Sequence, residues 1–571
     1  MDFVERTAKP TSGWFLVAVG LVVVIGVGIH LGAFGAPLAV DDYAQRDMCV
    51  RDGPFNLFDF INDANRSHLL AQGAIPWWSH PQIAVRFLRP VASALTWIDC
   101  RVFKSDPVVP HVLSFLCWGA AVISVARLFR NVMSERAALF GAAVFALSPC
   151  HSTPLVWLAN RSVLIAVAFG CWGLDSYLKW RAQPTRTLGI KTATLFLLAH
   201  LSGEYAIGFA AYVLAIEVSR KNETLHRRGV LVLPALVPGA FVVLGTLLLG
   251  YGPRHTGYYS NPFQDPLSFA KDAPSKLTAI LGSAVFGMDD PWLASSEHPF
   301  LWALMLALVM LAGTRFLKTR GDVGALWLLG GAVLACVPFL GALSQWRVLG
   351  TVMVGFAGYF GAIIDALIAE IGRRLKKPRD GLRATLFTAF LVGVLIIQMV
   401  RAPIKARASG AFTVEMATDF ARKFEVVRGS VRSGHTTVLL LRAQSPMSVL
   451  WTPFIFPERP TWVVASQSNE AIAVVRTGKK SIEIYPERGP LVSCGPHDGL
   501  NTRTMSEGEV IQIPGRRVTV LKVDSDGCPA RVSVEFEHDL DDPNIVWMVE
   551  THAGFEEIAR PTVGIGVRLQ P

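Results

Sequence analysis

GWFLVAVGLVVVIGVGIHLGAFGAPLAV (residues 13–40) carries no Asp, Glu, Lys or Arg and ends against the acidic pair Asp41-Asp42. A helix needs about 20 apolar residues to cross the hydrocarbon layer of a membrane, so this stretch is long enough to span one. It also exceeds the apolar core of about 7–15 residues typical of a cleaved signal peptide, so we expect a retained anchor. Two carboxylates at its end must face water or a protein cavity, because lipid disfavours charge.

The charge distribution supports a membrane protein. The chain has 571 residues, of which 51% are hydrophobic and 17% charged, and its net charge is +10. Soluble domains carry about 25% charged residues. Basic residues concentrate in every second gap between apolar runs, as the positive-inside rule requires of cytoplasmic loops. The positive charge is therefore explained by topology, and nucleic acid is not an expected partner.

Apolar length and charge alternation together predict a mainly α, polytopic bundle of about eleven spans in residues 1–403. The predicted spans lie near residues 14–39, 110–130, 136–150, 161–180, 188–202, 204–219, 229–250, 299–315, 323–343, 348–370 and 383–401. Two predicted outer loops are large, residues 41–109 and residues 251–299. With the N-terminus in the cytoplasm, an odd number of spans places the C-terminus outside.

The composition changes after the last predicted span. Residues 404–430 are predicted to form a juxtamembrane amphipathic helix that packs on the membrane domain or its interface. Its apolar stripe recurs every four residues, at Phe412, Met416, Phe420 and Phe424. Residues 431–571 contain short β-branched runs and a strong turn signal, residues 524–527, which are typical of a small external β-sandwich. The runs begin at Thr437, Ala471, Ser481, Val518 and Val532.

Four cysteines fall in segments expected outside the cytoplasm. We predict the pairs Cys49 with Cys100 and Cys494 with Cys528, because disulfides persist in oxidising compartments. The simplest such location is a bacterial inner membrane, with the active side and the C-terminal domain in the periplasm. The cysteine spacings match no metal site and no ligand cluster requires a metal, so the sequence establishes no cofactor and leaves a divalent cation open.

Several polar residues lie at predicted outer ends of spans, in a recognisable order. An Arg-Pro pair precedes the second span, a P-x-H…W-x-x-x-R stretch and a Ser-x-Glu follow, and an Arg comes late. These positions are Arg89, His151, Trp157, Arg161, Glu204 and Arg347. With the acidic pair after the first span, this order resembles the GT-C superfamily of integral-membrane glycosyltransferases, notably its mannosyltransferase-like branches, up to roughly residue 400.

The sequence also departs from the pattern of that superfamily. Thr153 stands where relatives often carry a second acid, and Gly203 stands where many carry a Lys. Trp346 and Val348 stand where they carry an acid and a Tyr beside the late Arg.

The resemblance implies an enzyme that transfers a sugar from a polyprenyl-phosphate donor to an acceptor outside the cytoplasm, with a first-loop acid as the base. The chemistry independently requires a base near the acceptor hydroxyl and cations on the leaving phosphate. We therefore predict Asp41 or Asp42 as the catalytic base. The predicted phosphate ligands are Arg161, Arg347 and Arg89, and the supporting residues are Glu204, His151, Trp157 and Arg254. The expected partners are a polyprenyl-phosphate sugar lipid, membrane lipids, and a glycan, lipid or protein acceptor.

Structural interpretations remain open for the same residues. The acidic pair is also suited to begin a loop helix, and Arg161 and Arg347 to anchor the ends of spans. For the whole chain, one alternative is a lipid or glycan transporter, which would concentrate ionisable groups at mid-membrane. The other is a non-catalytic envelope scaffold whose β domain binds a partner.

Overall fold

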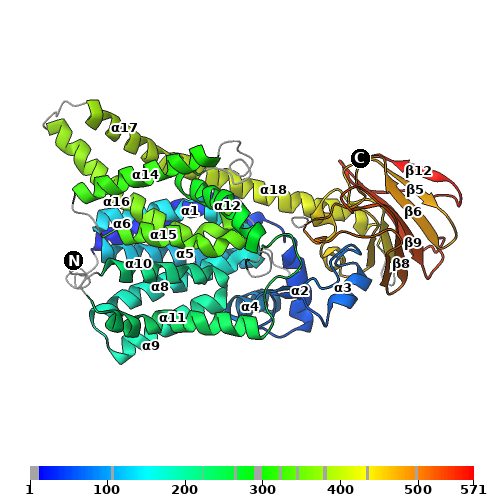
Figure 1. The fold of residues 1–571 in the computed structure, drawn as a ribbon, viewed down its shortest axis with the longest axis horizontal. Coiled ribbons are helices and arrows are strands. Elements are labelled where there is room, and N and C mark those ends of the chain that lie inside the picture. The colour runs from blue at the N-terminus through cyan, green and yellow to red at the C-terminus, as the bar shows by residue number, and fades with distance from the viewer. Residues whose placement is uncertain are drawn as a thin grey trace.

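The computed structural model describes residues 12–103, 108–220, 223–260, 262, 266–287, 299–320, 324–342, 346–376, 382–431, 436–495 and 499–570. In these residues the chain is mainly helical, with a C-terminal β-rich region. Figure 1 shows the helices gathered at one end of an elongated molecule and the strands at the other, with helix α18 (Ala402–Arg428) running between them.

A helix overlaps every stretch predicted to span the membrane. The long helices are α1 (Gly13–Ile29), α5 (Val108–Val132), α6 (Glu135–Ala146), α8 (Ser162–Ala182), α9 (Arg186–Ser202), α10 (Gly208–Ser219), α11 (Leu225–Leu248), α12 (Pro266–Phe286), α14 (Pro299–Thr319), α15 (Leu326–Ala335), α16 (Gly350–Lys376) and α17 (Leu382–Ile396). Among the residues described, four segments are long and apolar enough to cross a membrane. They are Val108–Val132, Leu225–Leu248, Phe300–Thr319 and Trp346–Arg373. A fifth results if the bent pair Glu135–Ala146 and Pro149–Val156 is one span, so the larger count of about eleven stays a prediction.

Close helix packing holds the bundle together. Helix α16 packs on α6 and α15. A Cβ on Gly361 would lie 2.4 Å from the backbone nitrogen of Gly141, so only glycine permits this approach of α16 to α6. Small residues of this kind let membrane helices come close enough for extensive van der Waals contact.

The segment predicted to be the first outer loop is itself folded. It contains α2 (Asp41–Arg51), β1 (Asp59–Ile61), α3 (Arg66–Gln72), β2 (Val85–Arg86), α4 (Pro90–Ile98) and a π-helical turn (Asp99–Phe103). The disulfide between Cys49 and Cys100 joins the first and last of these elements, which confirms that predicted pair. The region 251–299, expected as a loop, contains helix α12, whose apolar pattern is interrupted in sequence by Lys271, Pro274 and Lys276.

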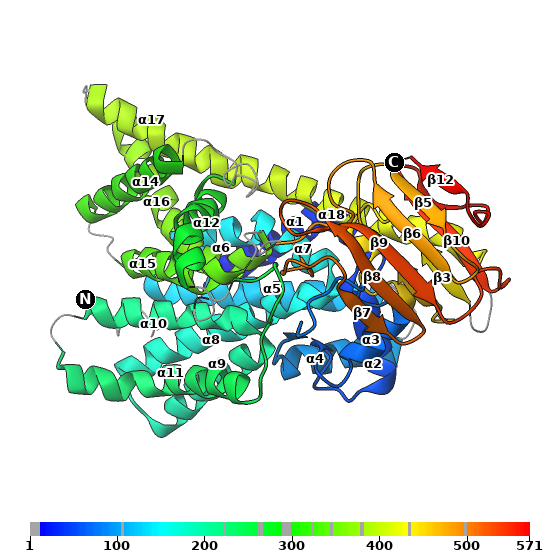
Figure 2. The ribbon, with the colours of Figure 1, turned by 45° about the vertical axis from the view of Figure 1, so that its right-hand side comes forward.

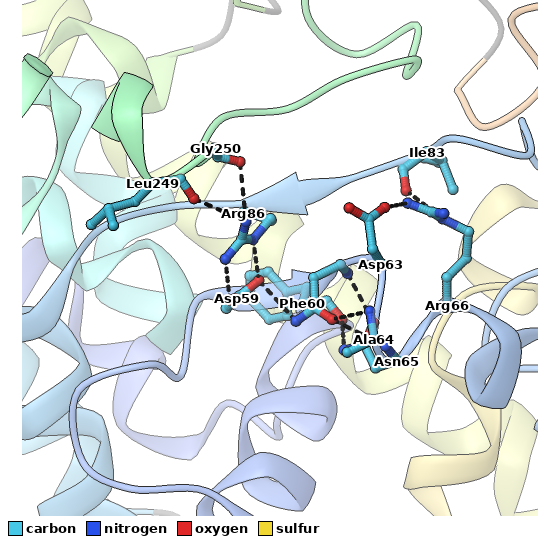
Figure 3. A network of polar contacts seen from close by, with 11 residues as sticks. Asp59, Phe60, Asp63, Ala64, Asn65, Arg66, Ile83, Arg86, Leu249 and Gly250 are labelled. Carbon is cyan, nitrogen blue, oxygen red and sulfur yellow. Dashed lines mark hydrogen bonds and ion pairs between the residues drawn. The ribbon is translucent and has the colours of Figure 1, made fainter. Parts of the chain in front are cut away.

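A network of polar contacts fixes this loop against the bundle (Figure 3). Arg86 on β2 donates to both carboxylate oxygens of Asp59 on β1, at 2.8 and 3.0 Å. The same guanidinium donates to the carbonyls of Leu249 and Gly250, just after α11, at 3.3 and 3.1 Å. Arg86 therefore ties the loop that carries the predicted site residues to the end of a candidate span.

The C-terminal region forms two sheets. The four-stranded sheet has the order β11-β10-β3-β4, and the six-stranded sheet has the order β12-β5-β6-β9-β8-β7. The strands are β3 (Thr437–Leu440), β4 (Thr461–Val464), β5 (Ile472–Arg476), β6 (Ser481–Pro486), β7 (Val510–Ile513), β8 (Arg516–Val523), β9 (Pro529–Phe536), β10 (Ile545–Thr551), β11 (Gly554–Glu557) and β12 (Gly566–Leu569). All five predicted runs overlap strands, and Figure 2 shows β5, β6, β9 and β8 side by side. Cys494 and Cys528 form the second predicted disulfide.

Helix α18 buries a different stripe from the one predicted. Phe420 and Phe424 are buried against the β-rich region, whereas Phe412 is 67% exposed. The reason is geometric, because a helix turns once in about 3.6 residues and a four-residue repeat drifts around it. The buried side follows alternating steps of three and four, through Ala406, Gly410, Thr413, Ala417, Phe420, Phe424 and Val427.

Candidate functional site

Asp41 is the first residue of α2, and its carboxylate lies near residues from several segments that are distant in sequence. Its Oδ1 accepts a hydrogen bond from the indole Nε1 of Trp451, at 3.0 Å. Burial raises the pKa of Asp41, while the Trp451 bond and the charges of Arg347 and Arg89 act to lower it. A raised pKa makes the carboxylate a stronger proton acceptor, and the neighbouring positive charges favour its ionised form.

The backbone just before Asp41 is strained. Val40 has a φ of 28°, which a β-branched residue rarely adopts. Such a conformation persists only where surrounding contacts hold it, and it is common at functional sites. Here it turns the chain from the extended segment after α1 into α2 and fixes where Asp41 begins the helix.

Asp42 faces a different environment from Asp41. Its Oδ2 accepts from the backbone nitrogen of Ala39 at 3.0 Å, and its Oδ1 accepts from that of Ala159 at 2.7 Å. The residue is 4% exposed, and burial raises its pKa to about 7 against the opposing effect of these donors. Asp42 thus connects α2 to the segment before α8, so the geometry gives the two neighbouring acids separate roles.

Arg89 and Glu204 form a bidentate ion pair near Asp41. The Nε and Nη2 of Arg89 donate to the two Glu204 oxygens, both at 2.8 Å, and Nη1 donates to Ser162 Oγ at 3.3 Å. The guanidinium lies against the rings of Phe87 and Tyr205, at 4.5 and 5.4 Å from their centroids. The pair is held rigidly, because each hydrogen bond and ring contact fixes the guanidinium plane.

Arg347 is the other cation beside Asp41. It lies in the short helical turn Trp346–Leu349, and its guanidinium stands 5.1 Å from the ring centroid of Trp157. No carboxylate in the described ranges pairs with it. Its positive charge therefore remains available to an anion next to Asp41.

Two tyrosines missed by the sequence analysis complete the site. Tyr259 pairs with Ala342 in an antiparallel bridge, and the backbone nitrogen of Ser260 donates to Gly341 O at 2.8 Å. Burial raises the pKa of Tyr259 to about 12, with Arg347, Tyr205, Arg89 and Glu204 as its charged or ionisable neighbours. The adjacent Tyr258 has its pKa raised by burial and by Asp41. The only sequence signal was the Tyr-rich character of residues 251–260.

Trp451 was also missed, because it comes from the β-rich region. It is 4% exposed and has a φ of 59°, a left-handed conformation that is unusual for an aromatic residue. Its backbone nitrogen donates to Ala74 O at 2.9 Å, and its ring packs beside Phe60 and Phe454. No local pattern in the sequence indicates that its indole reaches Asp41.

Three predicted residues are engaged with other partners. Arg161 is 1% exposed, pairs with Asp99, and donates to Pro110 O at 3.1 Å, so its guanidinium is fully engaged inside the protein. His151 is 1% exposed, and its Nε2 lies 2.8 Å from Phe145 O. Arg254 pairs through its backbone with Ala84. The site therefore brings together Asp41, Arg89, Glu204, Arg347 and Trp157 from the predicted set.

Within the described part of the chain, no group of three or more His, Cys, Asp or Glu residues could hold a metal ion.

Comparison with known proteins gives a similarity in structure alone. No family model and no curated protein matches the chain. The similar solved structures include the Archaeoglobus fulgidus oligosaccharyltransferase in the apo form, with 12% identity and a TM-score of 0.45 over 79% of this chain. The same enzyme, AglB, in complex with an inhibitory peptide and a dolichol-phosphate has 11% identity and a TM-score of 0.45.

The chain spans 64% of the length of that oligosaccharyltransferase. This neighbour is a membrane glycosyltransferase of the GT-C superfamily, the superfamily that the sequence resembles. At this identity and TM-score the likeness concerns the course of the chain, and we take no residue role from it.

Proposed function

We propose that this chain is a membrane glycosyltransferase that transfers a sugar from a polyprenyl-phosphate donor to an acceptor outside the cytoplasm. The observation that carries the proposal is the meeting of Asp41, with its raised pKa, and the unpaired Arg347 at one place. A base beside an available cation is what transfer from a phosphate donor requires. Both residues adjoin segments expected at the outer ends of spans.

The proposed step follows from these positions. Asp41 takes the proton of the acceptor hydroxyl while the hydroxyl oxygen bonds to the anomeric carbon of the sugar. The bond between that carbon and the phosphate oxygen breaks, and the phosphate leaves with the electron pair. Arg347 stabilises the negative charge of the phosphate, and Arg89 adds to the positive electrostatic potential there. Glu204 holds the guanidinium of Arg89 in place.

The proposal includes the membrane arrangement predicted from sequence. We carry forward about eleven spans in residues 1–403, a juxtamembrane helix in residues 404–430 and an outer β domain in residues 431–571. The two disulfides support an oxidising side for the first outer loop and the β domain, for which a bacterial periplasm is the proposed location. The proposed acceptor is a glycan, a lipid or a protein.

The test is sugar transfer in membranes that contain the chain, using a radiolabelled polyprenyl-phosphate sugar. Asp41→Asn keeps the shape of the side chain and removes the base, so transfer should fall by about 100-fold or more. Asp63→Asn is the control, because Asp63 is exposed and pairs with Arg66 away from the site. Undiminished transfer in Asp41→Asn would remove this residue from the mechanism, and absence of transfer from every donor would favour a scaffold.

A further inference from the structure

A cavity lies beside α2 and does not include Asp41. Its volume is about 710 Å³, within the range of sites that hold a small ligand. Its apolar wall includes Leu38, Pro110, Leu158, Phe454 and Phe456. Pro110 belongs to the first turns of α5, a candidate membrane span, so the apolar wall begins at the end of that span.

The cavity lining also includes cationic side chains. Arg46 on α2 and Arg428 at the end of α18 both line it. Burial raises the pKa of Tyr43, and the charges of Arg428 and Arg46 both oppose this rise, so the two guanidinium groups lie near one hydroxyl. Arg46 forms no ion pair with a carboxylate in the ranges that the structure covers, and Arg428 pairs only with the exposed Glu425 of its own helix.

The carboxylates of the cavity wall are already occupied by other partners. Asp47 pairs with Arg51 and Arg459, and Asp99 pairs with Arg161. Asp42 accepts two backbone N–H groups, as described above. Glu458, the remaining acid on the wall, shows no pairing among the described residues. The charge of Arg46 is therefore not cancelled by a direct contact.

Two buried acceptors in this wall lack a hydrogen-bond partner among the residues that the structure describes. They are Oε1 of Gln45, a residue that is 1% exposed, and Oδ1 of Asp99, a residue that is 6% exposed. A buried acceptor without a donor costs about 1–3 kcal/mol, so such groups normally have partners. Both line the same cavity, which indicates a ligand that brings hydrogen-bond donors.

We propose that this cavity binds the headgroup of an anionic phospholipid whose phosphodiester lies between Arg46 and Arg428. The hydroxyl groups of the headgroup donate to Gln45 and Asp99, and an acyl chain follows the apolar wall toward the end of α5. Charge, hydroxyl donors and an apolar chain are the three chemistries that the cavity walls complement. This site lies beyond the proposed transfer reaction and does not depend on it.

The binding test uses the full chain in a neutral maltoside detergent, with dihexanoyl-phosphatidylglycerol as the probe and native mass spectrometry or equilibrium dialysis as the readout. Wild type should bind one equivalent saturably. Arg46→Gln and Arg428→Gln should each raise the Kd by about tenfold, since each removes a charge-assisted bond. Dihexanoyl-phosphatidylmethanol has the same charge but no hydroxyl, and should bind about tenfold more weakly to wild type.

Control experiments distinguish binding in this cavity from nonspecific attraction to positive charge and from binding of a soluble anion. Arg422→Gln changes an exposed charge on α18, whose partner Asp419 also lies outside the cavity lining, and should leave the Kd unchanged. Glycerol phosphate tests the soluble anion, and binding as tight as that of the lipid would overturn the role of the acyl chain. Equal Kd values for wild type, Arg46→Gln and Arg428→Gln would overturn the site. The Asp41→Asn variant should bind the lipid with the wild-type Kd, because Asp41 does not line the cavity. A loss of sugar transfer in that variant therefore leaves the lipid-binding proposal unaffected.

Discussion

The indole Nε1 of Trp451 donates to Oδ1 of Asp41 at 3.0 Å, across a sequence separation of 410 residues. This contact joins the β-rich region to the first residue of α2. Because the bond favours the charged carboxylate, it opposes the rise in pKa that burial causes. The β-rich region is thereby part of the electrostatic environment of the proposed base.

Trp451→Phe tests that relationship. Phenylalanine keeps the aromatic packing and removes the donor, so the pKa of Asp41 should rise further. A hydrogen bond to a charged group is worth about 1.5–3 kcal/mol, so its loss favours the protonated carboxyl. The acidic limb of the pH profile of transfer should therefore move to higher pH. Trp462→Phe is the matched control, since Trp462 is buried in the β-rich region and its Nε1 has no partner; equal profiles for both variants would contradict the role of Trp451.

Asp42 is expected to matter for stability more than for catalysis. Asp42→Ala leaves the N–H groups of Ala39 and Ala159 without an acceptor, so the free energy of unfolding should fall by about 1–3 kcal/mol. Asp42→Asn should retain transfer within tenfold of wild type. Chemical unfolding in detergent and the transfer assay measure the two effects. A loss of transfer in Asp42→Asn as large as in Asp41→Asn would place Asp42, and not Asp41 alone, in the reaction.

Asp42 also gives the fold a pH dependence. Because the pKa of its carboxyl is raised to about 7, the folded state keeps this proton at pH values where the unfolded chain loses it. The contribution of Asp42 to stability is therefore full below about pH 4 and is lost as the pH rises to about 7. Asp42→Asn should flatten this part of the stability curve. An unchanged slope would show that Asp42 titrates normally.

Arg347 and Arg161 should respond differently to the same substitution. Arg347→Gln removes the available cation beside Asp41, so the KM for the donor should rise by about tenfold or more, with little change in unfolding. Arg161→Gln leaves the buried Asp99 without its partner and should lower the free energy of unfolding by about 3–5 kcal/mol. Adding Asp99→Asn should restore part of this loss. The reverse pattern, a KM effect from Arg161→Gln in a stable protein, would favour the original sequence prediction.

A histidine pair should make the outer region sensitive to acid. The rings of His80 and His255 stack with their centroids 3.9 Å apart. The backbone nitrogen of His80 donates to Leu500 O, and the hydroxyl of Thr502 donates to His255 O. Burial and nearby positive charge lower the pKa of His80 to about 4, and burial lowers that of His255. The unfolded chain therefore binds protons first as the pH falls, so stability is full above about pH 6.5 and declines below it.

His80→Asn should reduce the fall in melting temperature between about pH 7 and about pH 5. The control is His552→Asn, at an exposed position in the β-rich region. If both variants lose stability in acid as steeply as wild type, the stacked pair is not responsible for the acid sensitivity.

Local patterns predicted much of the fold. Each apolar run carries a helix, all five β-branched runs overlap strands, and both disulfides formed as predicted. They could not predict β4 or β10, whose parallel pairing with β3 depends on partners far away in the chain. Helix α12 was missed for a related reason, since its charged and proline residues hide an apolar pattern that only packing reveals.

The sequence by itself determined that the chain has apolar helices, a β-rich end and an acidic pair just after the first helix, because these follow from hydrophobic length, period and charge. Only the tertiary structure decided which acid meets the cations. Asp41 and Asp42 are adjacent in sequence, but successive residues on a helix point about 100° apart, so one reaches Trp451 and Arg347 while the other binds backbone N–H groups. The same holds for Arg161, whose partner Asp99 is brought to it by folding of the outer loop.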